Sequence, residues 1–453
     1  MIGNPEFRRN LWLELTPQRL VVMPLVLAAI FAVIYLGESG VAKWSGDATR
    51  YGGLATAALV VYLALALLWG GRQAAGAITD EIRDRTWDGQ RLSALGSWSM
   101  AWGKLFGSTV FTWYGALLAL AVYAASASIQ APPPTVTREV IVLLAQGLLC
   151  QATALLASLL YLRHKAPTRK PNAVLFHLAG LAAVALLWWT TDSFDTRIRH
   201  WPFTATVSRD GFELVATVAF AAWAVIGVWR LMRAELQFRT LPWLWFLFLV
   251  FLAAYASFIA GARPDFYYGP AAALFAVTYF LALVEPKDVV GLRRLLRRAG
   301  AGQVRGFFEV LPLSLLTYVV TALGLASLFL FDRADLAPPG SGVYGPALVL
   351  SGFLFMSRDL AILLALNLGR NPRRADVAAI VYWVVLYALV PLLLRSLHQS
   401  DLAALFRPDD RVSGLLSPLV QALLTFAWVV WRWRSAGRAV GLAKAAGTGQ
   451  IPA

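Results

Sequence analysis

The hydrophobic pattern of this chain is a series of long apolar runs separated by short charged segments. An apolar run of about 18 to 25 residues is long enough to span a bilayer as an α-helix. About twelve runs approach or reach that length, and they centre near residues 20–36, 54–68, 105–125, 140–162, 174–189, 214–231, 244–260, 271–284, 307–331, 348–368, 377–394 and 415–431. The pattern therefore predicts an all-α, polytopic membrane protein with about twelve transmembrane helices.

The composition agrees with this interpretation. Of the 453 residues, 59% are hydrophobic and only 14% are charged, whereas charged residues make up about a quarter of a soluble domain. The net charge of +15 would suggest nucleic-acid binding in a soluble protein. In a membrane protein it indicates the excess of Lys and Arg that faces the cytoplasm.

The distribution of positive charge predicts the topology. If the N-terminus is cytoplasmic, the inside segments hold about 28 Lys and Arg and the outside segments about 11. The densest inside loops are 163–170 and 293–298. We expect a multi-pass protein of the cell inner (cytoplasmic) membrane with both termini in the cytoplasm. Its cationic face should contact anionic lipid headgroups, so membrane lipids are expected partners.

Residues that could carry other chemistry are sparse. Cys150 is the only cysteine, and the four histidines are widely scattered, so we expect no intrachain disulfide and no metal site. A phosphate-binding P-loop requires G-x(4)-G-K-[ST]. The segment around Gly103 and Lys104 has Trp98 at the first glycine position and Leu105 at the hydroxyl position. We therefore predict that the chain is not an enzyme and has no cofactor of its own.

Internal similarity indicates a duplication. The ends of the sixth and twelfth runs read VWRLMR and VWRWRS, and Glu81 with Asp84 is echoed by Glu285 with Asp288. The ends of the fourth and tenth runs correspond at a similar offset. We predict two six-span units, residues 1–229 and 230–453. An even number of spans makes the units parallel repeats related by an axis along the membrane normal.

The N-terminal stretch NPEFRRNLWLEL, Asn4–Leu15, mixes apolar and charged residues at helical spacing. Its apolar residues share one face at 100° per residue, which predicts an amphipathic helix in the cytoplasmic interface. Pro17 or the turn before it should then direct the chain into the bilayer.

The longest charged segment between two apolar runs is AITDEIRDRTWDGQRLSALGSWSMAWGKLF, Ala77–Phe106. It connects the second and third predicted spans on the cytoplasmic side. Residues 80–92 favour a helix, and 95–105 resume an amphipathic pattern. A solvated loop with tryptophans anchored at the headgroups is one interpretation. Docking of a soluble partner is the other.

The second interpretation is supported by a resemblance. The pattern E-x(4)-T-x-D at Glu81–Asp88, then Leu92, then GKLF at Gly103–Phe106 resembles the permeases of the ABC type 2 export family. The amphipathic start of the chain is similar to the same family. In this family the segment carries a glycine where this chain has Arg85 and a proline near Leu95. The second half of the chain keeps Glu285 and little else of the pattern.

The resemblance implies a membrane subunit of an ABC exporter whose coupling helix docks in a groove of an ATP-binding cassette ATPase subunit. ATP and magnesium would bind to that separate subunit. Fixed charges would form the polar part of that interface, and Trp87 and Trp98 would be its anchors. The residues implied in coupling are Glu81, Arg85, Thr86, Trp87, Asp88, Lys104, Glu285 and Asp288. Whether the second segment binds an ATPase, and whether a second permease chain pairs with this one, is left open.

The outside loops, such as Ala131–Arg138, are too short to form a substrate-handling domain, so we expect a lipid-like or amphipathic substrate. A different class also predicts two six-span halves. GAITDEIRDR, Gly76–Arg85, shares Gly76, Ile78 and Asp80 with the signature of the major facilitator superfamily of secondary transporters. A non-transporting membrane scaffold or a lipid-modifying enzyme is a third alternative.

One charged pair lies inside a predicted span. Arg358 and Asp359 fall about halfway along residues 348–368, where each charge costs roughly 2.5 to 3.5 kcal/mol. Adjacent residues point about 100° apart on a helix, so we expect that the two do not neutralise each other and that each has its own partner inside the protein. The equivalent depth of the fourth span offers the uncharged Gln151. We expect the pair at the interface of the two halves, either locking them together or lining the transport route. The alternative is a span that is shifted or broken here, so that the pair reaches the headgroups or water.

Overall fold

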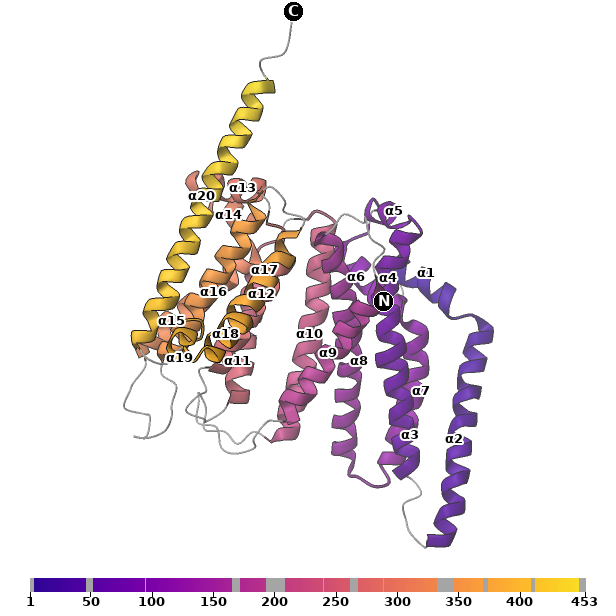
Figure 1. Ribbon diagram of the computed structural model, residues 1–453. Coiled ribbons are helices and arrows are strands. Elements are labelled where there is room, and N and C mark those ends of the chain that lie inside the picture. The colour runs from indigo at the N-terminus through magenta and orange to yellow at the C-terminus, as the bar shows by residue number, and fades with distance from the viewer. Residues whose placement is uncertain are drawn as a thin grey trace, which may run out of the picture. The chain divides into compact units, whose positions relative to one another are not determined.

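The computed structural model is all-helical, with no strand among the residues that it describes. Figure 1 shows the course of the chain. The described residues are 4–45, 52–93, 95–164, 172–192, 208–238, 240–260, 268–287, 289–331, 346–369, 374–408 and 412–447. They divide into two compact units, Met1–Thr240 and Leu241–Ala453.

The first unit begins with the short helix α1 and continues with long apolar helices. One of them is interrupted by a π-helical turn, η2, between α3 and α4. Its elements are α1 (Pro5–Glu14), α2 (Pro17–Ser45), α3 (Gly52–Leu63), η2 (Ala64–Trp69), α4 (Gly70–Arg83), α5 (Trp87–Arg91), α6 (Ser97–Gly107), α7 (Val110–Ala127), α8 (Pro133–His164), α9 (Ala173–Asp192) and α10 (Arg209–Glu235).

The second unit has more short elements and a second π-helical turn, η5. Its elements are α11 (Trp243–Ala260), α12 (Tyr268–Val284), α13 (Val289–Gly300), α14 (Val304–Val310), α15 (Leu313–Phe331), α16 (Pro346–Asn367), α17 (Ala375–Val384), η5 (Val385–Leu389), α18 (Val390–Ser396), α19 (Ser400–Ala404), η6 (Val412–Leu415) and α20 (Leu416–Gly447).

Most of the twelve apolar runs follow these helices, but the run 105–125 crosses the break between α6 and α7, and the run 307–331 crosses the bend of 107° between α14 and α15. In the described part of the chain, eight helices are long and apolar enough to cross a membrane, or ten if two bent pairs each form one span. These helices are those of a multi-pass membrane protein. The predicted spans on α11 and α20 are outside that count, so twelve spans, like the duplication, stay a prediction.

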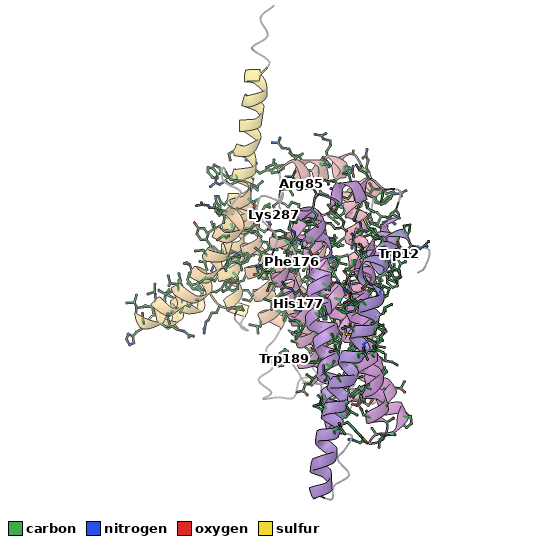
Figure 2. The ribbon with its side chains drawn as sticks, turned by 90° about the vertical axis from the view of Figure 1, so that its right-hand side faces the viewer. Trp12, Arg85, Phe176, His177, Trp189 and Lys287 are labelled. Carbon is green, nitrogen blue, oxygen red and sulfur yellow. The ribbon has the colours of Figure 1, made fainter. Side chains whose placement is uncertain are left out.

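The N-terminal helix was predicted correctly as an element. Asn4 caps α1, because its side-chain oxygen accepts hydrogen bonds from the backbone N–H groups of Glu6, at 3.1 Å, and Phe7, at 3.5 Å. The helix packs on α6 with a polar face, since Glu6 is buried while Trp12 is 80% exposed. Figure 2 shows Trp12 on the outer side of the unit. A polar inner face with an exposed indole suits a helix whose outer face meets lipid.

Candidate functional site

The candidate coupling segment, residues 77–106, forms the end of α4, the short helix α5, and α6. Figure 1 shows α5 at one end of the first unit. The predicted continuous helix over residues 80–92 is wrong, because α4 ends at Arg83 and a new helix begins at Trp87. The break lies at Arg85, whose φ of 60° is in the left-handed region.

The break is a Schellman motif with an arginine at the usual glycine position. The N–H of Thr86 donates to the carbonyl of Glu81 at 2.9 Å, and the N–H of Arg85 donates to the carbonyl of Ile82 at 3.1 Å. The hydroxyl of Thr86 also donates to the carbonyl of Glu81. The glycine expected from the resemblance would therefore fit this turn without steric cost.

Trp87 fixes this segment to its own bundle. The indole is buried in a cluster that includes Ile78 of α4, Met100 of α6, Leu159 of α8 and Met232 of α10. The interpretation of Trp87 as an anchor for a partner is therefore wrong for this structure, because the ring is already enclosed by four helices.

Trp98, the second predicted anchor, is half exposed. It stacks on Trp102, with ring centroids 5.2 Å apart, and meets the ring of Trp229 edge-on at 6.1 Å. Arg91 adds a polar tie, because its guanidinium donates to the carbonyl of Glu235 at 3.0 Å. The segment therefore contacts α10 at two places, through the ring of Trp229 and through the carbonyl of Glu235.

Lys104 is the centre of a buried ionic junction, which we define as Glu6, Arg9, Glu81 and Lys104. The Nζ atom of Lys104 lies 2.8 Å from a carboxylate oxygen of Glu6 and also pairs with Glu81. Arg9 approaches the same carboxylates, at 3.1 Å from Glu6 and 2.7 Å from Glu81. Two cations and two carboxylates therefore connect α1, α4 and α6.

The glycines of the GKLFG sequence explain how α1 approaches so closely. A Cβ at Gly103 would lie 2.7 Å from the side chain of Glu6, and a Cβ at Gly107 would lie 2.7 Å from that of Asn10. The two glycines are four residues apart and so share one face of α6. Leu105, between them in sequence, is buried in the hydrophobic cluster around Trp87. The two glycines therefore admit α1 on one face of α6, and Leu105 packs into the bundle.

The outer turn, residues 83–92, presents a surface of mixed charge. The side chain of Asp88 is 89% exposed, and Leu92 is 88% exposed. Figure 2 shows Arg85 at one end of the unit, far from Trp189. The remaining exposed residues of this turn are Arg83, Asp84, Arg85, Thr86 and Gly89.

The corresponding acid of the second unit has a different environment. The carboxylate of Glu285 accepts hydrogen bonds from the N–H groups of Leu313 at 2.6 Å and Ser314 at 2.9 Å, and from the hydroxyl of Ser314 at 2.6 Å. It therefore caps the N-terminus of α15, where a negative charge is favourable. Lys287, next to it, forms an ion pair with Asp376 at 3.2 Å. Asp288 lies outside the described residues.

The buried polar network of the second unit consists of Arg358, Asp359, Tyr279, Tyr387 and Gln421. The Nε and Nη2 atoms of Arg358 donate to Oδ1 of Asp359 at 2.9 and 2.8 Å. The hydroxyls of Tyr279 and Tyr387 each donate to Oδ2 of Asp359 at 2.7 Å. The Nη1 atom of Arg358 donates to Gln421 at 2.6 Å.

One expectation about this pair is corrected. The two side chains do pair with each other, because Nε and Nη2 of the long, planar arginine head both reach Oδ1 of Asp359. The partners on α12, η5 and α20 all belong to the second unit, and the expected place at an interface of the halves stays a prediction. As predicted, both groups are buried and each has further partners of its own.

Gln151 of α8 lies beside the π-helical turn of the first unit. Its Nε2 donates to the carbonyl of Ala66 at 3.0 Å, and its Oε1 accepts from the indole of Trp113 at 2.7 Å. A ring nitrogen of His177 lies 3.1 Å from the carbonyl of Leu67. A π-helical turn displaces carbonyls from the regular α-helical ladder, and these side chains satisfy two of them. Gln151 is therefore a structural partner of η2.

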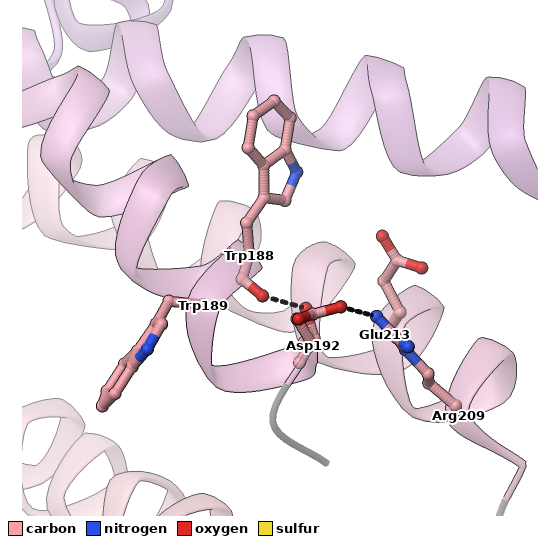
Figure 3. Close-up of a pocket in the computed structure, with 6 residues that line it drawn as sticks. Trp188, Trp189, Asp192, Arg209 and Glu213 are labelled. Atoms are coloured by element: carbon pink, nitrogen blue, oxygen red, sulfur yellow. Dashed lines mark hydrogen bonds and ion pairs between the residues drawn. The ribbon is translucent and has the colours of Figure 1, made fainter.

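A small open pocket lies where α9 ends and α10 begins (Figure 3). Asp192 and Arg209 form an ion pair across it, and Trp188 and Trp189 lie at its edge. Glu213 completes its polar wall. The exposed indoles at a helix end are typical of the membrane–water boundary.

Sequence reasoning missed the partners of the predicted residues. Glu6 and Arg9 were assigned only to an amphipathic helix, and the contact with Lys104 depends on tertiary packing. Tyr279 and Tyr387 carried a usable signal, since hydroxyls inside apolar runs need a hydrogen-bond acceptor. Comparisons with models of protein families, with curated protein sequences and with solved structures find no match to this chain.

Proposed function

We propose that this chain is the membrane permease subunit of an ATP-driven exporter similar to the ABC type 2 family. The observation that supports this most directly is the construction of the candidate coupling segment. Its outer turn is polar, mixed in charge and exposed, while Trp87 beneath it is enclosed by helices of the same unit. A segment that must pass on a mechanical push needs an accessible contact surface on a rigid base.

The path of such a push follows from the contacts. Movement of the outer turn would act on α10 through Trp87 and through the hydrogen bond from Arg91 to Glu235. It would act on α1 through the ionic junction, because Lys104 binds carboxylates from two other helices. ATP-driven closure of a partner could therefore move several helices of this unit together. The transported molecule is proposed to be lipid-like or amphipathic.

The roles of the predicted residues divide under this proposal. Thr86, Asp88 and Arg85 lie on the accessible turn and would contact the ATP-binding subunit. Glu81 and Lys104 would act as positioning residues, because their charges are engaged within the unit. Glu285 caps a helix in the second unit, which favours a single coupling surface on the first unit.

The test is charge reversal of the outer turn. Arg83→Glu with Asp88→Lys keeps the net charge and leaves the buried base unchanged. We expect this variant to reach the membrane normally but to lose co-purification of an ATP-binding protein from native membranes. The matched control is Arg395→Glu with Asp401→Lys, at exposed positions of the second unit. Loss of ATP-binding protein from both variants, or from neither, would contradict the proposal. Transport that needs no ATP would support a secondary transporter instead.

A further inference from the structure

We propose that α13 and α14 of the second unit form a binding surface for anionic lipid headgroups. We define this basic surface as Arg294, Arg297 and Arg305 with the apolar side chains of Leu296 and Val304. The proposal is independent of the coupling function, since it concerns a different unit and a different class of partner.

The first observation is the strongly one-sided distribution of charge on α13. At about 100° per residue, its four arginines fall within one arc of roughly 140°, while Leu292, Leu295 and Leu296 fall within an opposite arc of about 100°. Leu295 is buried against its own unit. Leu295 therefore packs inward, while Arg294 and Arg297 face outward. Leu296 lies at the edge of the apolar arc, about 60° from Arg293, and stays exposed.

The second observation is that two of the three arginines of the basic surface, Arg294 and Arg297, have no counter-charge among the described residues, whereas Arg305 lies 3.7 Å from Glu309. Arg298 is engaged, because it donates to the carbonyl of Gly306 at 2.6 Å and lies 3.8 Å from Glu309. Arg293 lies over the ring of Trp433 at 5.7 Å. Within the part of the chain that the structure describes, Arg294 and Arg297 are exposed and have no acidic partner.

The third observation is the position of this surface at the end of a membrane-spanning helix. The direction of the chain changes by 117° between α12 and α13, and by 107° between α14 and α15. Figure 1 shows α13 and α14 at the end of the second unit opposite to α19. The first arginine of α13, Arg293, comes nine residues after the end of the apolar helix α12 at Val284, and basic clusters directly after an apolar span are typical of binding to anionic headgroups.

Exposed apolar side chains on the same elements favour a lipid surface over a soluble partner. Leu296 is 59% exposed and Val304 is 67% exposed. Trp243, stacked near Phe308 of α14, is exposed as well. Arginine heads beside apolar and indole side chains match the boundary between phosphates and acyl chains. The outer turn of the first unit differs, because acidic residues alternate there with arginines.

The experiment measures lipid binding to the full-length protein in a neutral detergent. Native mass spectrometry would count bound molecules of phosphatidylglycerol or phosphatidylcholine during titration. We expect the unaltered protein to prefer phosphatidylglycerol. Arg294→Gln with Arg297→Gln should weaken phosphatidylglycerol binding roughly tenfold or more and leave phosphatidylcholine binding unchanged. Arg294→Lys with Arg297→Lys should retain most of the preference, since the charge is kept.

The matched control is Arg395→Gln with Arg407→Gln, which removes the same charge from exposed positions near α18 and α19. Unchanged phosphatidylglycerol binding in this control supports a local site. An equal loss in both double variants, or no preference in the unaltered protein, would overturn the proposal. The proposal would also be overturned if Arg294→Gln with Arg297→Gln lost a co-purified protein but still bound phosphatidylglycerol. Thermal unfolding should match the unaltered protein, because both arginines are exposed.

Discussion

Single residues with left-handed backbone mark the ends of several helices in this protein. Arg85, Gln237 and His398 have φ near 60°, and Gly302 has φ of 65°. Each follows a helix at the position where glycine is preferred, because a side chain there meets the backbone. The turns at Arg85, Gln237 and His398 therefore cost conformational free energy that a glycine would not.

The first prediction concerns Arg85. Replacing it with glycine should stabilise the first unit by about 0.5 to 1 kcal/mol, because the left-handed conformation costs a non-glycine residue roughly 1 kcal/mol or more. Thermal unfolding in detergent would measure the change. Arg83→Gly is the control, since Arg83 is exposed and helical, and there glycine should destabilise by a similar amount. A lower unfolding temperature for Arg85→Gly would contradict the assignment of the turn.

The Arg358–Asp359 pair carries the second residue-scale prediction. Arg358→Met should destabilise the protein by about 3 to 5 kcal/mol, because it leaves the buried carboxylate of Asp359 without its cation. Adding Asp359→Asn should recover more than half of that loss, since the amide oxygen still accepts from Tyr279 and Tyr387. Unfolding by denaturing detergent would measure both variants. If the single and double variants were equally stable, the role of Arg358 would not be to compensate the negative charge of Asp359.

The sequence predicts the burial of such charged residues better than it predicts their contacts, because a long side chain can reach partners that lie away from its own Cβ direction. The position of Arg358 and Asp359 inside an apolar run showed that they are buried, because exposed charges cannot remain in hydrocarbon. Their mutual contact was not predicted, since the 100° rule describes Cβ directions and a guanidinium reaches well beyond its own Cβ. Similarly, burial of Trp87 depends on four helices whose packing no local pattern encodes.

At the scale of elements, the ionic junction explains why α1 packs on α6 with its polar face. The helix itself was predictable from Asn4, Pro5 and the periodicity that follows. Its orientation was not, because the charge that attracts it, Lys104, is 98 residues away in sequence from its partner Glu6. The same limit applies to the predicted helix over residues 80–92, which a single left-handed residue divides into two.

A third prediction follows for α1. Lys104→Met should leave the carboxylates of Glu6 and Glu81 close together with only Arg9 to balance them, at a cost of about 3 to 5 kcal/mol. We expect α1 to detach and to become sensitive to trypsin at Arg8 and Arg9. Limited proteolysis of the purified protein, with cleavage sites identified by mass, would measure this.

Two companion variants test the cause. Adding Glu6→Gln and Glu81→Gln to Lys104→Met should restore resistance to trypsin, because no uncompensated carboxylate remains and the one remaining charge, on Arg9, is 45% exposed to solvent. Lys287→Met, which breaks the ion pair with Asp376 in the second unit, should leave α1 resistant. Unaltered resistance in the Lys104→Met protein would contradict a role for the junction in holding α1.

At the scale of the whole molecule, the charge pattern predicts which loops face the cytoplasm. The helices by themselves do not determine this orientation. The fourth prediction uses single cysteines introduced after Cys150→Ala. Asp88→Cys should react with a membrane-impermeant maleimide only after the cells are opened, because the outer turn is predicted to be cytoplasmic. Arg407→Cys, an exposed position after α19, should react in intact cells. Labelling of Asp88→Cys from outside would reverse the predicted orientation.

The division of the chain carries the last prediction. The two compact units meet in sequence between Thr240 and Leu241, close to the boundary expected from the internal similarity. If the protein is expressed as two polypeptides, 1–240 and 241–453, each keeps the hydrogen bonds and hydrophobic clusters of its own unit. Both polypeptides should therefore reach the membrane, and each should unfold cooperatively. A break between Leu360 and Ala361, inside α16, should abolish accumulation of both fragments, because it cuts the helix that holds the buried polar network. If that break were tolerated as well as the break after Thr240, the units would not be independent packing units.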